Sequence, residues 1–134
     1  MSDMTYPLDA LTSGGGFNQQ GVAGETLPAY KPVYLSNAGT WMLADASSES
    51  TMPAAALTVE AIPSGKSGKI LLVGIIQNNL WSWTPGNLLY VSTSTGEITI
   101  TPPNTTGNQV QVIGIALSQT LIIFNPTYVL VEVA

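Results

Sequence analysis

The sequence contains no cysteine, no histidine and no arginine among its 134 residues. Without cysteine, disulfide bonds and thiolate metal sites are excluded. Without histidine, neither Ser-His-Asp nor Cys-His nucleophilic systems nor histidine zinc sites can be built. Without arginine, the chain has no guanidinium group to bind a phosphate in bidentate fashion. These three absences remove most of the common catalytic chemistries.

Charge is also scarce in this chain. Charged residues make up 8% of the sequence, against roughly 25% in typical soluble domains. The only cations are Lys31, Lys66 and Lys69, and the net charge is −5. Proteins that bind the backbone of DNA or RNA need clustered basic side chains. We therefore expect no nucleic-acid partner, and the same deficit argues against docking to an anionic membrane surface.

The remaining polar residues offer little chemistry. A glycosidase needs two positioned carboxylates, but the eight acidic residues are dispersed along the chain. Residues 65–67 match the end of a P-loop, yet Glu60 stands where its first glycine belongs and no helix is expected to follow. Asp45 and Glu49 do not have the spacing of an EF-hand loop, which favours a solvated polar loop over a calcium site. We predict that the protein is not an enzyme and has no metal or cofactor.

What the sequence does contain is a series of short β-rich runs separated by turn residues. No segment of ten or more residues has the apolar period of an amphipathic helix. The sequence Thr93-Ser94-Thr95-Gly96 is typical of a hairpin turn with glycine in the left-handed conformation. The expected strands are residues 32–35, 40–43, 54–61, 69–77, 87–92, 97–101, 109–117, 121–124 and 128–133. A 45% hydrophobic content and this spacing predict one all-β domain, a compact antiparallel β-barrel or β-sandwich.

Two segments of the chain resemble each other. Residues 69–76 and 109–116 are both apolar runs with a glycine in the middle, Gly74 and Gly114. A glycine inside a strand commonly marks a bulge or a close approach of two backbones. The similarity indicates either two related β-units in one body or a chance likeness between β-rich segments.

The N-terminal residues 1–20 differ from the body, residues 21–134. They contain no basic start followed by an apolar stretch, so we do not expect a signal peptide. The run of three glycines that ends at Gly16 is a flexible joint. We predict an extended N-terminal arm that docks on a partner, with a frayed terminus as the alternative. The side chains expected to bind are Tyr6, Leu8, Leu11 and Phe17.

The aromatic residues Tyr30, Trp81 and Trp83 are candidates for a second contact surface. Trp81 and Trp83 are two residues apart in a segment expected to be extended, which puts them on the same side. Exposed tryptophan and tyrosine are favoured at protein interfaces and also form platforms for sugars. Three interpretations stay open: a cap on the core, a protein–protein interface, and a carbohydrate site.

Three segments carry a resemblance to a known family. They are GETLPAYKPVYL (residues 24–35), LWSWTPGNLLYVS (residues 80–92) and QVQVIGIAL (residues 109–117). In this order they resemble the small β-barrel modules of bacteriophage structural proteins, above all capsid cement (decoration) proteins. The likeness extends over about residues 21–133 and does not include residues 1–20. Similar modules occur in head and tail fibres.

The resemblance implies a role that composition does not show. Capsid cement proteins typically sit as trimers on the outer surface of the phage head and clamp neighbouring subunits of the major capsid protein. The expected partners are therefore the major capsid protein and two further copies of this chain. A receptor- or carbohydrate-binding module of a fibre or adhesin is the alternative, and a structural unit of a tail or baseplate is a third.

Overall fold

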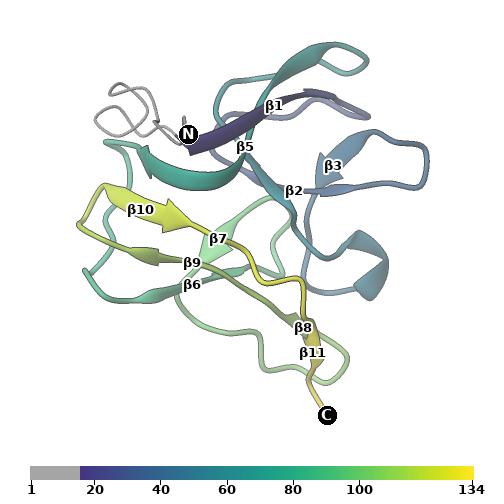
Figure 1. Cartoon of the computed structure of the whole chain (residues 1–134). Coiled ribbons are helices and arrows are strands. Elements are labelled where there is room, and N and C mark those ends of the chain that lie inside the picture. The colour runs from purple at the N-terminus through teal and green to yellow at the C-terminus, as the bar shows by residue number, and fades with distance from the viewer. Residues whose placement is uncertain (1–15) are drawn as a thin grey trace, which may run out of the picture.

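The computed structural model describes residues 16–134 and confirms the all-β prediction. Nine strands form one large antiparallel sheet that curls into a half-barrel, and two short strands form a separate ribbon near the C-terminus (Figure 1). The strands are β1 (Gly16–Val22), β2 (Pro32–Leu35), β3 (Trp41–Leu43), β4 (Ala56–Thr58), β5 (Ser67–Gln77), β6 (Leu88–Val91), β7 (Ile98–Thr99), β8 (Gln109–Val110), β9 (Val112–Ala116), β10 (Leu121–Phe124) and β11 (Val131–Glu132).

Helical structure within residues 16–134 is limited to one 3-10 turn, η1 (Glu49–Thr51). Its N-cap is Ser48, whose side chain accepts a hydrogen bond from the backbone N–H of Ser50. In this part of the chain no helix has the length and apolar character needed to cross a membrane.

Strand β5 is the centre of the sheet. Ile70 and Leu71 are each paired with β1 on one side and with β4 on the other. From Gly74 to Gln77, β5 pairs with β10, and Gly74 is also paired with Gly16 of β1. The first half of β5 therefore leads to β4, β2 and β3, and its second half leads to β10, β9, β6 and β7. One eleven-residue strand thus joins the two halves of the curled sheet.

Two hydrophobic clusters form the core, and β5 contributes to both. Successive side chains of a strand point to opposite faces, so the neighbours Ile70 and Leu71 belong to different clusters. The larger cluster includes Leu57, Leu71, Leu89, Ile113, Ile122 and Phe124. The smaller cluster includes Leu27, Val33, Ile62 and Ile70. Full burial of each such side chain contributes about 1.5–3 kcal/mol before entropic costs.

The strand predictions hold for most of the chain. β2 and β10 have the predicted bounds, and Gly96 has the left-handed φ of 74° expected for the hairpin turn. The expected strand over 109–117 is divided into β8 and β9 at Gln111. The division arises because the Gln111 side chain turns inward to bond the backbone of Ala54, while β8 pairs with β11.

The glycines that relate 69–76 to 109–116 occupy matching positions. Phe124 of β10 is paired with Gly74 of β5 on one side and with Gly114 of β9 on the other. A Cβ atom on Gly114 would collide with the backbone carbonyl of Ile123. The close backbone approach predicted for a mid-strand glycine is therefore present at Gly114.

The sequence-based boundary between arm and body falls inside a strand. Residues 16–20, assigned above to the arm, belong to β1 and pair with β5 from Gly74 to Lys69. Sequence patterns miss β1 because residues 17–20 are exposed and three of them are amides, so no apolar alternation marks the strand. Tyr6, Leu8 and Leu11 lie outside the described residues. From here on, "arm" refers to residues 1–15.

Candidate functional site

Three aromatic side chains from two distant segments meet at one place. The ring centroids of Tyr30 and Trp81 are 5.7 Å apart in an edge-to-face arrangement, with an interplanar angle of 70°. The rings of Trp81 and Trp83 are 5.9 Å apart and tilted by 48°. All three are partly buried and pack against the larger core cluster. The predicted aromatic residues therefore form one cluster, and their inner faces cap the core.

The turn that carries Tyr30 is tied to β4. Tyr30 has a φ of 64°, a left-handed conformation that is uncommon for a bulky residue. Its N–H donates to the carbonyl of buried Thr58 at 2.8 Å. The Thr58 hydroxyl donates to the carbonyl of Pro28 at 2.6 Å and accepts from the N–H of Lys31 at 2.8 Å. Strained backbone persists only where surrounding contacts fix it, and Thr58 supplies these contacts.

The segment that carries the two tryptophans is anchored in the same way. The side-chain oxygen of Asn78 accepts from the N–H of Leu80 at 3.0 Å, and its backbone carbonyl accepts from the N–H of Trp81 at 3.0 Å. The N–H of Trp83 donates to the carbonyl of Gln119 at 2.9 Å. The β9–β10 turn therefore holds Trp83 in position, while Asn78 orders the tight turn before it.

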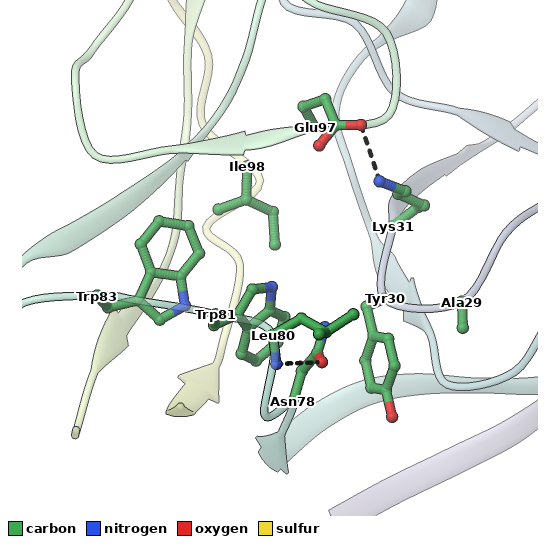
Figure 2. A pocket seen from close by; sticks show the side chains of 9 residues that line it. All are labelled: Ala29, Tyr30, Lys31, Asn78, Leu80, Trp81, Trp83, Glu97 and Ile98. Carbon is green, nitrogen blue, oxygen red and sulfur yellow. Dashed lines mark hydrogen bonds and ion pairs between the residues drawn. The ribbon is translucent and has the colours of Figure 1, made fainter. Parts of the chain in front are cut away.

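A pocket of about 260 Å³ opens between these two segments. Figure 2 shows the aromatic side chains and Asn78 at one end and an ion pair at the other. In the ion pair, Lys31 Nζ lies 2.8 Å from Glu97 Oε2, and the side chains are 26% and 54% exposed. The residues that line the pocket are Ala29, Tyr30, Lys31, Asn78, Leu80, Trp81, Trp83, Glu97 and Ile98. The pocket thus combines aromatic surface with hydrogen-bonding groups and with one charge of each sign.

The indole N–H of Trp83 is the one buried side-chain polar atom within residues 16–134 that has no hydrogen-bond partner. In Figure 2 its nitrogen faces Trp81. A buried donor without a partner costs about 1–3 kcal/mol, and such groups in native structures call for an explanation. Trp83 therefore carries a buried polar group whose cost the rest of the fold has to offset.

Of the four residues predicted to bind through the arm, Phe17 is the one that lies within residues 16–134. Phe17 lies in β1, is 53% exposed and pairs with Val73. The sequence patterns did not predict the other six pocket residues, among them the polar residues Lys31, Asn78 and Glu97. Lys31 adjoins Tyr30 in the sequence, and Asn78 lies three residues before Trp81. This proximity to the predicted aromatic residues was the one sequence signal for Lys31 and Asn78. Glu97 carried no such signal, because only folding brings the β6–β7 hairpin to Lys31.

Asp45, one of the two residues considered above for a calcium site, has a structural role. Burial alone would raise the pKa of Asp45, but hydrogen bonds from the Ser47 hydroxyl, the Ser47 N–H and the Thr95 hydroxyl lower it below its usual value. Asp45 thereby links its own turn to the β6–β7 hairpin. Within residues 16–134, no group of three or more His, Cys, Asp or Glu side chains is placed to hold a metal ion.

The P-loop-like residues 65–67 form a tight turn. Gly65 has a φ of 81°, and the N–H of Lys66 donates to the carbonyl of Pro63 at 3.0 Å. The chain continues from this turn into β5. A strand therefore follows where a phosphate-binding loop requires a helix.

Comparison with known proteins identifies no relative. No protein-family model matches the chain, and no curated protein sequence matches it. The function proposed below therefore depends on the sequence and on the geometry described above.

Proposed function

We propose that this chain is a structural protein of a bacteriophage virion: a capsid cement protein that binds the outer surface of the head and stabilises contacts between major capsid subunits. The proposal starts from the resemblance of residues 24–35, 80–92 and 109–117 to phage β-barrel modules. The composition agrees with it, because a protein without His, Cys or Arg has few catalytic options.

The observation that carries the proposal is the pairing of β1, the strand that follows residues 1–15, with β5. The arm leads into β1, which is paired with β5 over seven residues, from Gly16 opposite Gly74 to Val22 opposite Ser67. Because the hydrogen bonds of an antiparallel ladder run perpendicular to the strands, a pull along β1 would be shared by the whole ladder. A clamp needs such a connection between its arm and its body.

The exposed side chains of β1 are suited to lie against another protein. β1 exposes neutral amides, Asn18, Gln19 and Gln20, together with the apolar side chains of Phe17 and Val22. The cores of protein interfaces are depleted in charged residues, since burying an unpaired charge costs far more than burying an amide that gains a hydrogen bond. β1 can thus extend the contact that the arm begins.

Three arms on one trimer would convert a weak contact between each arm and the capsid into stable attachment. Each apolar side chain buried on the shell contributes about 25 cal/mol per Å² before ordering costs are subtracted. Linking several such contacts raises the overall affinity by roughly 10²–10⁴ when all engage together. A trimer with three short arms therefore provides stable attachment without a large interface per arm.

Deletion of residues 1–15 is expected to abolish stable attachment to the capsid while the body stays folded. The deletion removes Tyr6, Leu8 and Leu11 but keeps all of β1, so the β1–β5 ladder remains intact. Co-sedimentation with purified heads that lack this protein measures the attachment, and circular dichroism measures the fold. Attachment of the truncated protein equal to that of the full chain would show that the arm is not the clamp.

A matched pair of full-length variants separates the arm from apolar surface in general. One carries Tyr6→Ser, Leu8→Ser and Leu11→Ser. The control carries Val129→Ser and Val131→Ser, which remove exposed apolar side chains near the C-terminus. The arm variant should lose attachment and the control should keep it. The opposite result would assign attachment to the C-terminal ribbon, and failure of the unaltered protein to bind any head would refute the cement proposal.

The purified chain is expected to be a homotrimer. Closed cyclic symmetry is the rule for soluble homo-oligomers, and the cement role implies three-fold symmetry. Light scattering coupled to size-exclusion chromatography should give a mass of about three chains per particle. A monomer at micromolar concentration would contradict this prediction.

A further inference from the structure

We propose that the pocket between Tyr30, Trp81 and Glu97 binds a neutral saccharide through one pyranose ring. This goes beyond the cement role and does not depend on it. A pyranose has an apolar C–H face and a rim of hydroxyl groups. The pocket has the complementary division, with aromatic rings at one end and the Lys31–Glu97 pair at the other (Figure 2). Small-molecule sites typically combine apolar walls with a few convergent polar groups.

The charges around the pocket select a neutral ligand. Aromatic residues also bind cations over their ring faces, but here the repulsion from Lys31 offsets the attraction to Glu97. For an anion such as a phosphate or a carboxylate, the repulsion from Glu97 offsets the attraction to Lys31. The two charges lie 2.8 Å apart and largely cancel at a distance. A neutral ligand with many hydroxyl groups avoids both repulsions and uses both charges.

The polar groups of the pocket retain unused hydrogen-bonding capacity. Only Oε2 of Glu97 contacts Lys31, so Oε1 can accept from a ligand hydroxyl. An ammonium has three donors, of which Lys31 uses one on Glu97. The Nδ2 atom of Asn78 makes no hydrogen bond to any residue within 16–134, whereas its Oδ1 is occupied by Leu80. Because a hydroxyl both donates and accepts, adjacent hydroxyls of one sugar can satisfy these groups together.

The aromatic wall is held in place before any ligand arrives. Thr58 fixes the strained turn at Tyr30, and the β9–β10 turn fixes Trp83. Binding then costs little ordering of the protein, and such preorganisation is what gives a small site useful affinity. Leu80, 92% exposed at the rim, offers a further apolar contact to a second sugar ring.

A pair of asparagine variants tests the proposal with little risk to the fold. Asn78→Asp keeps the oxygen that accepts from Leu80 but replaces the free Nδ2 donor with a carboxylate oxygen. Asn79→Asp makes the same chemical change one residue away, on a side chain that does not line the pocket. The readouts are tryptophan fluorescence and saturation-transfer NMR. The probes are maltose, cellobiose, lactose and chitobiose, each titrated into the tens of millimolar.

We expect at least one of these disaccharides to bind with a millimolar dissociation constant. Asn78→Asp should weaken that binding about tenfold, the value of one net hydrogen bond, and Asn79→Asp should leave it unchanged. Trp81→Ala should abolish it, with circular dichroism reporting whether the variant folds and Tyr128→Ala serving as the exposed aromatic control.

Three results would overturn the proposal. The first is that none of the four disaccharides binds the unaltered protein. The second is that the two asparagine variants bind equally well, which would locate the sugar elsewhere. The third is that choline or a tetraproline peptide binds the pocket in preference to every sugar, which would assign it to a cation or to a proline-rich partner.

Discussion

Replacement of Gln111 by leucine is expected to destabilise the protein by about 3–5 kcal/mol. Gln111 is 1% exposed, and its side-chain amide binds the backbone of two other segments. Its oxygen accepts from the N–H of Ala54 at 2.8 Å, and its nitrogen donates to the carbonyls of Ala54 at 2.8 Å and Thr127 at 2.5 Å. Leucine leaves the buried N–H and carbonyl of Ala54 without partners and also frees the part-buried carbonyl of Thr127. Each buried group without a partner costs about 1–3 kcal/mol, partly offset by the added apolar burial.

The measurement is equilibrium unfolding in urea, with the midpoint and the slope compared between variants. Gln77→Leu is the matched control, because Gln77 is exposed and, within residues 16–134, its side chain bonds only Asn79 and Thr120. The control should stay within about 0.5 kcal/mol of the unaltered protein. Equal effects of the two substitutions would mean that the buried amide network contributes no more than an exposed side chain.

Replacement of Gly114 by alanine is expected to cost about 3 kcal/mol, the upper end of the usual range for overpacking. The added methyl group would meet the backbone carbonyl of Ile123 in the neighbouring strand. A backbone carbonyl within a paired strand cannot move aside as the end of a flexible side chain can. β9 and β10 would therefore have to separate where buried Phe124 packs.

Thermal and urea unfolding of Gly114→Ala can be compared with a glycine in open space. Gly39 has a φ of 82°, and a Cβ atom added there would meet nothing within 4 Å beyond its chain neighbours. Asparagine tolerates this backbone conformation, so Gly39→Asn should cost less than about 1 kcal/mol. If Gly114→Ala proved as mild as Gly39→Asn, the two strands would have to be able to shift apart at little cost.

The two functional proposals concern different parts of the chain, so an experiment can contradict one of them without contradicting the other. The clamp depends on the arm and β1, whereas the saccharide pocket is built from the turn at Tyr30, the segment from Asn78 to Trp83, and the β6–β7 hairpin. Deleting residues 1–15 should leave saccharide binding unchanged. Asn78→Asp should leave capsid attachment unchanged. Loss of both functions in one variant would indicate a folding defect.

Local sequence was enough to predict those strands whose own residues are apolar and are bounded by turn residues. Residues 121–124 are apolar and follow a polar turn, and they form β10 as expected. Gly96 was assigned to a left-handed turn position from its neighbours alone, and its φ of 74° agrees. The absence of His, Cys and Arg likewise narrowed the possible chemistry before any fold was known. These features depend on composition and on residues near one another in the chain.

Tertiary structure decided what depends on distant partners. β1 is a strand because it pairs with the edge of β5. The sequence of β1, with its exposed amides, has no apolar period that would predict a strand. Gln111 divides the strand predicted over residues 109–117 because its side-chain amide bonds the backbone of Ala54, 57 residues away. The pocket exists because folding brings Glu97 to Lys31 and Trp81 to Tyr30. A local sequence pattern indicates which side chains of a segment are buried. The pairing of distant segments is fixed by hydrogen bonds and packing that form only in the complete fold.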